Sequence, residues 1–191
     1  MSKKVILAAL CAVATVFGAS AQKLVGDISP LKGQQKVNVV IDFAGTTVEK
    51  KVESVYIANE TRRMNAADKE KWLTDWNVTL RSQARELFIT EVNNGLKNQS
   101  FLVGDFPDAG CTIVVKVLDI TPGSFMPISK SSVLKVDVNF VGKDGKTFAT
   151  IPYKYISNSA SSYIPVLVTR IVMSYGVLGV NVAAVINKNL K

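Results

Sequence analysis

The fold is decided by the stretch Val133-Leu-Lys-Val-Asp-Val-Asn-Phe-Val141, in which apolar and other residues alternate. Successive side chains of a β-strand point to opposite faces, so this pattern predicts a half-exposed strand with one face on a core. Gly142-Lys-Asp-Gly145 follows, and its Asp-Gly pair is typical of a hairpin turn. We therefore expect a return strand over Thr147–Ile156, in which Pro152 favours an edge position or a bulge.

Three further segments on the amino-terminal side of this hairpin have the composition of strands. Lys36–Phe43 is rich in β-branched residues and nearly continuous in apolar character, which predicts a central strand. Phe101–Val103 predicts a short strand, and Thr112–Ile120 predicts a long buried one. The Gly, Pro and Asp residues of Gly104–Gly110 predict a turn between these two.

Two helices are expected between the first and second of these strands. Val48–Met64 places apolar residues at helical spacing, which predicts a short amphipathic helix. Asp68 is the expected N-cap of a longer helix that ends near Asn98. Its apolar stripe consists of Trp72, Trp76, Leu80, Ala84, Leu87 and Phe88. Two large rings on one helix face need burial, so we interpret the tryptophan pair as core rather than as a ligand-binding platform.

The carboxyl-terminal segment Tyr163–Ile186 is almost uncharged and carries only Arg170. Helical spacing fits most of it, with Pro165 expected in the first turn. Its length and the small residues of Gly179-x-x-x-Ala183 would suit a helix inserted in a membrane. We favour a helix that covers the apolar face of the sheet, because that face needs a cover of about this length.

These elements predict an α+β fold with the architecture of a two-layer sandwich. We expect a four- to five-stranded antiparallel or mixed sheet, with the long Trp-bearing helix and the apolar carboxyl-terminal helix packed on it. Residues 22–191 are long enough to form a single domain with its own core.

Residues 1–21 have the features of an export signal. Lys3 and Lys4 precede an apolar run that is too short to span a bilayer. Ala19-Ser-Ala21 is a small-x-small site, so we expect cleavage between Ala21 and Gln22. The mature chain then contains one cysteine, Cys111, which we interpret as a small buried hydrophobe. Export predicts a location in the periplasm, at the outer membrane or at the cell surface.

The composition argues against several kinds of catalysis and binding. The chain has 23 Lys and Arg residues, 15 Asp and Glu residues and no His, so it lacks the commonest general base and the commonest metal ligand. Its basic residues are scattered beside acidic ones, and no basic stripe interleaved with aromatics, which would favour nucleic-acid binding, occurs in the sequence. We expect no cofactor, no metal and no nucleic-acid partner. An unknown envelope protein or an anionic envelope surface fits the mild positive charge better.

Few residues are candidates for a site. Asp105 and Asp108 bracket a turn and could take a hard cation, although two carboxylates there more often stabilise the turn. Asp119 and Asp137 fall in neighbouring expected strands and could form a carboxylate pair for glycoside hydrolysis. Ser132 and Lys135 match a Ser-x-x-Lys motif, but in a strand residues three apart point to opposite faces. We interpret that match as chance.

The organisation of the chain resembles a group of exported Bacteroidetes proteins of unknown function. The resemblance rests on Lys23-Leu-Val-Gly-Asp27, Leu31-Lys-Gly-Gln34, Val37 to Phe43, the Lys71-Trp72…Trp76 helix and Phe106-Pro-Asp-Ala109. The carboxyl-terminal helix departs from that group, because its apolar character replaces a charged amphipathic pattern.

A looser similarity involves the segments Thr112–Gly123, Val133–Val141 and Lys143-Asp-Gly145 with the strand that follows. They look like the α/β domain of curli-secretion lipoproteins and TolB amino-terminal domains. Those domains are envelope assembly modules, so the resemblance implies a binding or scaffolding role.

The sequence thus predicts an exported, non-enzymatic cell-envelope protein with a binding or scaffolding role. One alternative is a membrane-associated protein anchored by residues 163–187. A more distant alternative is a carboxylate-dependent hydrolase of an envelope polymer, which would use Asp105 or Asp137.

Overall fold

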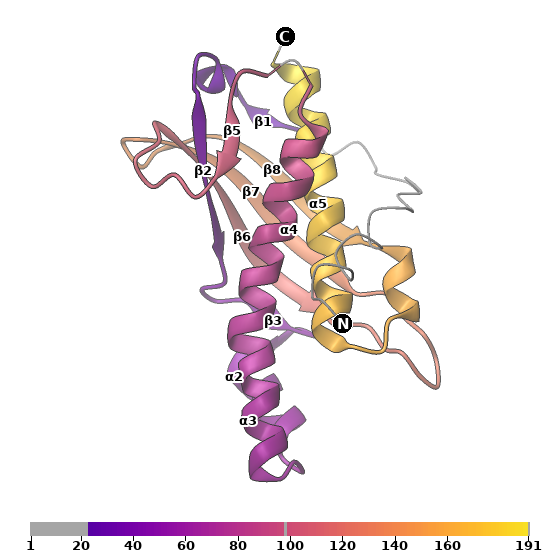
Figure 1. Cartoon of the computed structure of the whole chain (residues 1–191). Coiled ribbons are helices and arrows are strands. Elements are labelled where there is room, and N and C mark those ends of the chain that lie inside the picture. The colour runs from indigo at the N-terminus through magenta and orange to yellow at the C-terminus, as the bar shows by residue number, and fades with distance from the viewer. Residues whose placement is uncertain (1–22, 98, 191) are drawn as a thin grey trace, which may run out of the picture.

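The structure is a computed structural model that describes residues 23–97 and 99–190. One mixed sheet carries its helices on one face, and the two longest helices run side by side across it (Figure 1). The predicted mixture of helices and strands, with one mixed sheet and a carboxyl-terminal helix, is therefore confirmed. The expected signal segment and the Ala21–Gln22 cleavage site lie outside the described residues.

The sheet has eight strands, so the expectation of four or five was wrong. Its order is β1-β8-β7-β6-β2-β5, and β3 and β4 lie off this path. The bounds are β1 Val25–Gly26, β2 Lys36–Asp42, β3 Thr47–Val48, β4 Lys51–Val52, β5 Leu102–Gly104, β6 Cys111–Thr121, β7 Val133–Gly142 and β8 Thr147–Ser157. The strands that were not expected are β1, β3 and β4, and each contains only 2 residues, which is too short to show a period in the sequence.

The long strands follow the predicted pattern. β6, β7 and β8 are antiparallel, and β2 runs parallel to β6 in the interior of the sheet. The apolar side of β7 is fully buried beneath the helices, as the alternation predicts. Pro152 of β8 lies beyond the short strand β1, which pairs only with Ala149 and Thr150. A register shift follows it, so that Lys154 and Tyr155 together oppose Lys135.

The segment expected as one amphipathic helix divides into a hairpin and a helix. Val48 and Val52 lie in β3 and β4, which are joined by Glu49 and Lys50 at φ 52° and 63°. Only the remainder, α2 (Glu53–Thr61), is helical. Positive φ at both central residues gives the strong twist that a two-residue hairpin needs. Gly, Asn and Asp favour this conformation, so a turn formed by Glu and Lys cannot be recognised from the sequence.

The long Trp-bearing helix consists of α3 (Ala66–Thr74), a π-helical turn η2 (Asp75–Thr79) and α4 (Leu80–Gly95). Its N-cap is Asn65, whose side chain accepts a hydrogen bond from the backbone of Asp68, so the assignment of Asp68 as the cap was wrong. Asp68 instead places a carboxylate in the first turn, where the helix dipole favours it. The predicted end near Asn98 is a few residues too late, because Leu96 is already extended.

Two short 3₁₀ segments complete the chain, η1 (Ser29–Leu31) and η3 (Ser159–Tyr163), and η3 leads into the final helix α5 (Leu167–Asn189). Pro165 precedes the N-cap Val166 and so lies outside the first turn where it was expected. This helix is long and apolar enough to cross a membrane, yet 67% of its most apolar window is buried inside the protein.

The small residues of α5 allow close approach to α4. A Cβ atom added at Gly179 would lie 2.8 Å from the carbonyl oxygen of Phe88, and one added at Gly95 would lie 2.7 Å from the Cβ of Ala183. The Gly179-x-x-x-Ala183 pattern, which also suits membrane helices, therefore serves the contact between two helices of the core.

Candidate functional site

A hollow lies between the last residues of β2 and the helix α4. It has a volume of about 510 Å³ and is lined by residues 40–44, Arg81 and Arg85. The residues of β2 are held in place by β6, and the two arginines occupy successive turns of one helix face. Strand and helix thus present backbone and guanidinium groups to the same space.

The backbone on this side of β2 is only partly paired. β5 covers Lys36–Asn38, and β4 covers Thr47–Val48 farther along the same edge. In the part of the chain that the structure describes, no strand pairs with residues 39–46 on that side. Because the backbone groups of alternate residues point to the same edge, those of Val39 and Ile41 face away from β6, toward the hollow.

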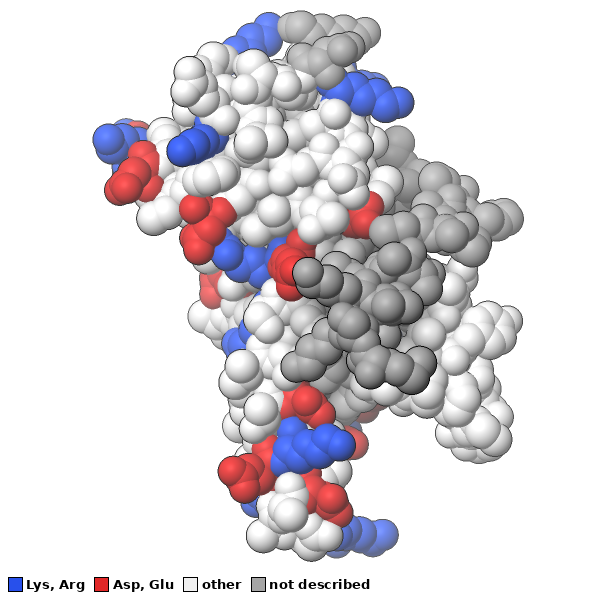
Figure 2. Space-filling view, viewed as in Figure 1, with Lys and Arg blue, Asp and Glu red and all other residues white. Residues whose placement is uncertain are grey.

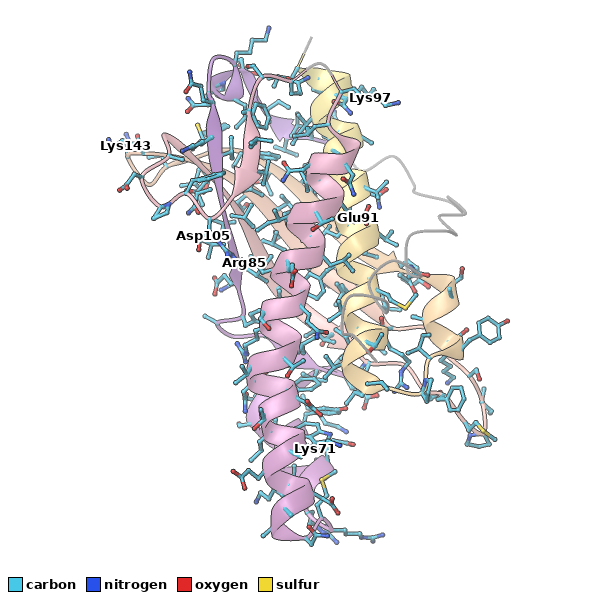
Figure 3. The ribbon with its side chains drawn as sticks, viewed as in Figure 1. Lys71, Arg85, Glu91, Lys97, Asp105 and Lys143 are labelled. Atoms are coloured by element: carbon cyan, nitrogen blue, oxygen red, sulfur yellow. The ribbon has the colours of Figure 1, made fainter. Side chains whose placement is uncertain are left out.

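Arg85 occupies part of this gap. Its Nε and Nη2 atoms donate hydrogen bonds to the carbonyl oxygen of Val39 at 3.2 and 3.1 Å. Nη2 also donates to Asp105 Oδ1 at 2.9 Å, and the carboxylate of Asp105 is 76% exposed. Figure 3 shows the two side chains meeting beside β2. The guanidinium therefore binds the carbonyl of Val39 as a neighbouring strand would. It leaves the outward-facing backbone groups of Ile41 without such a contact.

Arg81, one turn earlier on α4, is held by its own partners. Its Nη2 donates to Glu53 Oε1 at 3.0 Å, and the indole of Trp76 donates to the same oxygen at 2.8 Å. Its guanidinium lies 4.5 Å from the centre of the Phe43 ring, a cation–π arrangement. Trp76 is buried and stacks on Trp72, so the interpretation of this pair as core is confirmed for Trp76, while Trp72 remains half-buried.

Two of the lining residues, Asp42 and Ala44, are held by Lys116 of β6. Lys116 Nζ donates to Asp42 Oδ2 at 2.8 Å and to the carbonyl oxygen of Ala44 at 2.7 Å. The hydrogen bond from Lys116, together with one from the backbone of Ala44, holds the pKa of Asp42 below its usual value. Asp42 is therefore ionised at neutral pH and fixes the turn that follows β2.

The sequence-predicted candidates are only partly brought together. Asp105 lies at the rim of the hollow through Arg85, whereas Asp108 is exposed in the same turn. No cluster of three or more potential metal ligands occurs among residues 23–97 and 99–190. Asp119 accepts hydrogen bonds from Thr47 and from the backbone of Lys50, which turn its carboxylate away from Asp137.

Two other candidates behave as structural residues. The hydroxyl of Ser132 is buried against Ser174 and the carbonyl oxygen of Arg170, while Lys135 is exposed. The Ser-x-x-Lys match was therefore chance. Cys111 is buried, and desolvation raises the pKa of its thiol, as expected of a small hydrophobe.

Sequence reasoning gave no role to Arg81 or Arg85. The available signal was their spacing of four residues at the edge of an apolar helix stripe, which also describes an ordinary solvated face. What distinguishes Arg85 is the carbonyl group it meets, and that contact depends on β5 being short.

No protein-family model matches the chain, and no curated protein matches it. Among solved structures, the chain is similar to PelC in a dodecamer from Paraburkholderia phytofirmans, with 10% identity over 86% of this chain and 95% of that one and a TM-score of 0.45. A single-substitution PelC variant from the same organism gives 9% identity, coverage of 83% and 94%, and a TM-score of 0.40. Similarity at this level carries no argument about function.

Proposed function

We propose that this protein is an exported, non-enzymatic component of the cell envelope that binds an extended segment of a partner protein. The observation that carries the proposal is the gap in the sheet edge at residues 39–46, flanked by Arg81 and Arg85. The resemblance of the chain to exported proteins and envelope assembly modules agrees with this role in the periplasm, at the outer membrane or at the cell surface.

Strand addition would use the backbone that the sheet leaves open. A partner segment running along β2 would form hydrogen bonds with the N–H and C=O of Ile41, and its main chain would supply most of the affinity. Arg85 would release the carbonyl of Val39 to the incoming strand while it keeps a carboxylate partner. An acidic side chain of the partner would replace the exposed Asp105.

The alternative of an anchor formed by residues 163–187 carries a structural cost. To span a bilayer, α5 would have to leave α4 and the sheet, which would expose the buried side of α5 and the core beneath it to water. Packing of α5 therefore supports the binding role over the anchor.

Cross-linking at the gap tests the binding role. A photo-crosslinking residue would replace Val40, which is 41% exposed at the hollow, in cells that export the protein. We expect a discrete adduct with one envelope protein. The matched control is Val78, which is 61% exposed on η2, outside the hollow. Equal adducts at both positions, or none at Val40, would contradict the proposal.

A further inference from the structure

Two loops at one end of the sheet expose large apolar side chains to solvent. Residues 122–132 join β6 to β7, and residues 158–166 join β8 to α5. Met126, Ile128 and Tyr163 are 73%, 68% and 76% exposed. We call these three residues, with Phe125 and Val166, the apolar platform. In Figure 2 the lobe at lower right is free of charged atoms, whereas the tip formed by α2 and α3 is densely charged.

Buried polar contacts hold the two loops together. Arg170 donates from Nε to the carbonyl oxygen of Pro122 at 3.3 Å, and from Nη1 to those of Ile164 and Pro165 at 2.9 Å each. The side chain of Ser161 accepts a hydrogen bond from the backbone of Ser132 at 3.0 Å. The apolar platform therefore lies on two loops that are hydrogen-bonded to each other and to α5. Because these loops are already ordered in the free protein, less conformational entropy is lost when the platform binds.

The charged side chains within the two loops and the segments that flank them are basic, while Glu49 of the β3–β4 turn lies at the end of β6, where its N–H donates to the carbonyl oxygen of Ile120 at 2.9 Å. The sequence contains no Asp or Glu in residues 120–136 or 145–191. Lys130 is exposed at the base of the first loop, and Lys154 is exposed on the bulged part of β8 near the second. Apolar side chains at the tips of the loops, with lysines and no acids in the same segments, complement a surface that is apolar inside and anionic at its boundary.

We propose that the apolar platform docks the protein onto an anionic lipid bilayer. Met126 and Ile128 would enter the boundary of the acyl region, and Tyr163 would sit at the level of the headgroups. Lys130 and Lys154 would lie against anionic headgroups. Docking of this kind leaves α5 in the core and does not use the gap beside β2, so it is independent of the proposed binding role.

Vesicle co-sedimentation of the full protein tests this inference. The probes are vesicles of phosphatidylcholine alone and of phosphatidylcholine mixed with phosphatidylglycerol. We expect binding to the mixed vesicles that an alkaline carbonate wash reverses. Met126→Ser combined with Ile128→Ser should weaken that binding at least about tenfold, because both side chains lose apolar contact with lipid. Val78→Ser, an equally exposed position on η2, should leave it unchanged.

The lysines give a second, independent measurement. Lys130→Gln should lower binding to the mixed vesicles about fivefold and leave the weak binding to phosphatidylcholine unchanged. The inference would be overturned if the wild-type protein did not bind the mixed vesicles. It would also be overturned if the double serine variant bound them as well as wild type. A lipid-free oligomer that the double variant converts to monomer would overturn it as well, because the platform would then bind a second copy.

Discussion

The guanidinium of Arg85 donates two hydrogen bonds to the carbonyl oxygen of Val39, and so does for β2 what a neighbouring strand would do. An unpaired strand edge is a template for another chain, and proteins commonly blunt such edges with charge or a covering helix. Here the helix supplies the charge, and it leaves the next outward-facing residue of β2 uncovered. The contact therefore satisfies one carbonyl of this edge, and the proposed binding role places the partner segment beside it.

Replacement of Arg85 by Ala should lower the free energy of unfolding by about 1–2 kcal/mol, because the carbonyl of Val39 loses a charged donor. Arg85→Lys should recover part of this loss, since one ammonium cannot reproduce a two-donor contact. Chemical denaturation measures both, with Arg63→Ala at an exposed position as the control. A stability equal to wild type in Arg85→Ala would show that water satisfies this carbonyl as well as the arginine does.

Two proline variants test which N–H groups of β2 face β6 and which face the open edge. The N–H of Val40 faces β6, so Val40→Pro should remove a ladder hydrogen bond and cost about 3 kcal/mol or more. The N–H of Ile41 faces the open edge, so Ile41→Pro should cost clearly less. Thermal unfolding of the two variants gives the comparison. The reverse order would mean that the outward edge is at residue 40 and that the gap is misplaced.

The close contact between α4 and α5 depends on Gly179. Gly179→Ala would place a methyl group 2.8 Å from the backbone oxygen of Phe88, and overpacking against backbone should cost about 1–3 kcal/mol. The same substitution at Gly145, where nothing lies within 4 Å but φ is +77°, separates backbone strain from packing. If α5 instead functions as a membrane anchor, Gly179→Ala should leave the unfolding of the remaining domain unchanged.

Tyr175 is fully buried on α5, and its hydroxyl has no hydrogen-bond partner among residues 23–97 and 99–190. Burial raises its pKa well above the usual value, so the group stays neutral over the whole working range of pH. Tyr175→Phe removes the unsatisfied hydroxyl and should be neutral or stabilising by about 1 kcal/mol. A loss of stability on calorimetry would reveal a polar partner for this hydroxyl.

Because Asp42 is paired with Lys116, we expect the stability of the fold to depend on pH in the acidic range. Because the pKa of Asp42 is lowered in the folded protein, its stabilising contribution is complete above the unfolded pKa and disappears as the pH falls through the folded one. Wild type should therefore exceed Asp42→Asn in stability near neutral pH, and the difference should vanish in acid. Urea denaturation across that range measures it, and a constant difference would exclude this titration as the cause.

The long elements of this fold could be predicted because their periods repeat. Thr112–Ile120 and Val133–Val141 became β6 and β7 with few changes at their ends, and the apolar stripe of the long helix identified its buried face. The hairpin of β3 and β4 could not be foreseen, because Glu49 and Lys50 adopt a conformation that their residue types rarely take. The predicted number of strands was too small for a different reason, because β1, β3 and β4 have two residues each and strands of that length show no pattern in the sequence.

The candidate site was less accessible to sequence reasoning than the fold. Asp105 was selected for its turn, and the structure places it at the rim of the hollow, but as a partner of Arg85 rather than of Asp108. The contact between Arg85 and Val39 arises from a strand edge, a helix and a turn that are far apart in the chain. The sequence around each of these residues looks like that of an ordinary protein surface. The site is therefore recognised only from their arrangement in space.

The most direct test of the binding role is the affinity of the cross-linked partner segment for wild-type protein and for Ile41→Pro. This substitution removes the outward N–H that strand addition requires, and Arg81, Arg85 and the β6 side of β2 stay in place. We predict a loss of at least about tenfold in affinity, equivalent to about 1.4 kcal/mol, for a variant that remains folded. Equal affinity in the folded variant would contradict strand addition at β2 and place the partner elsewhere on the molecule.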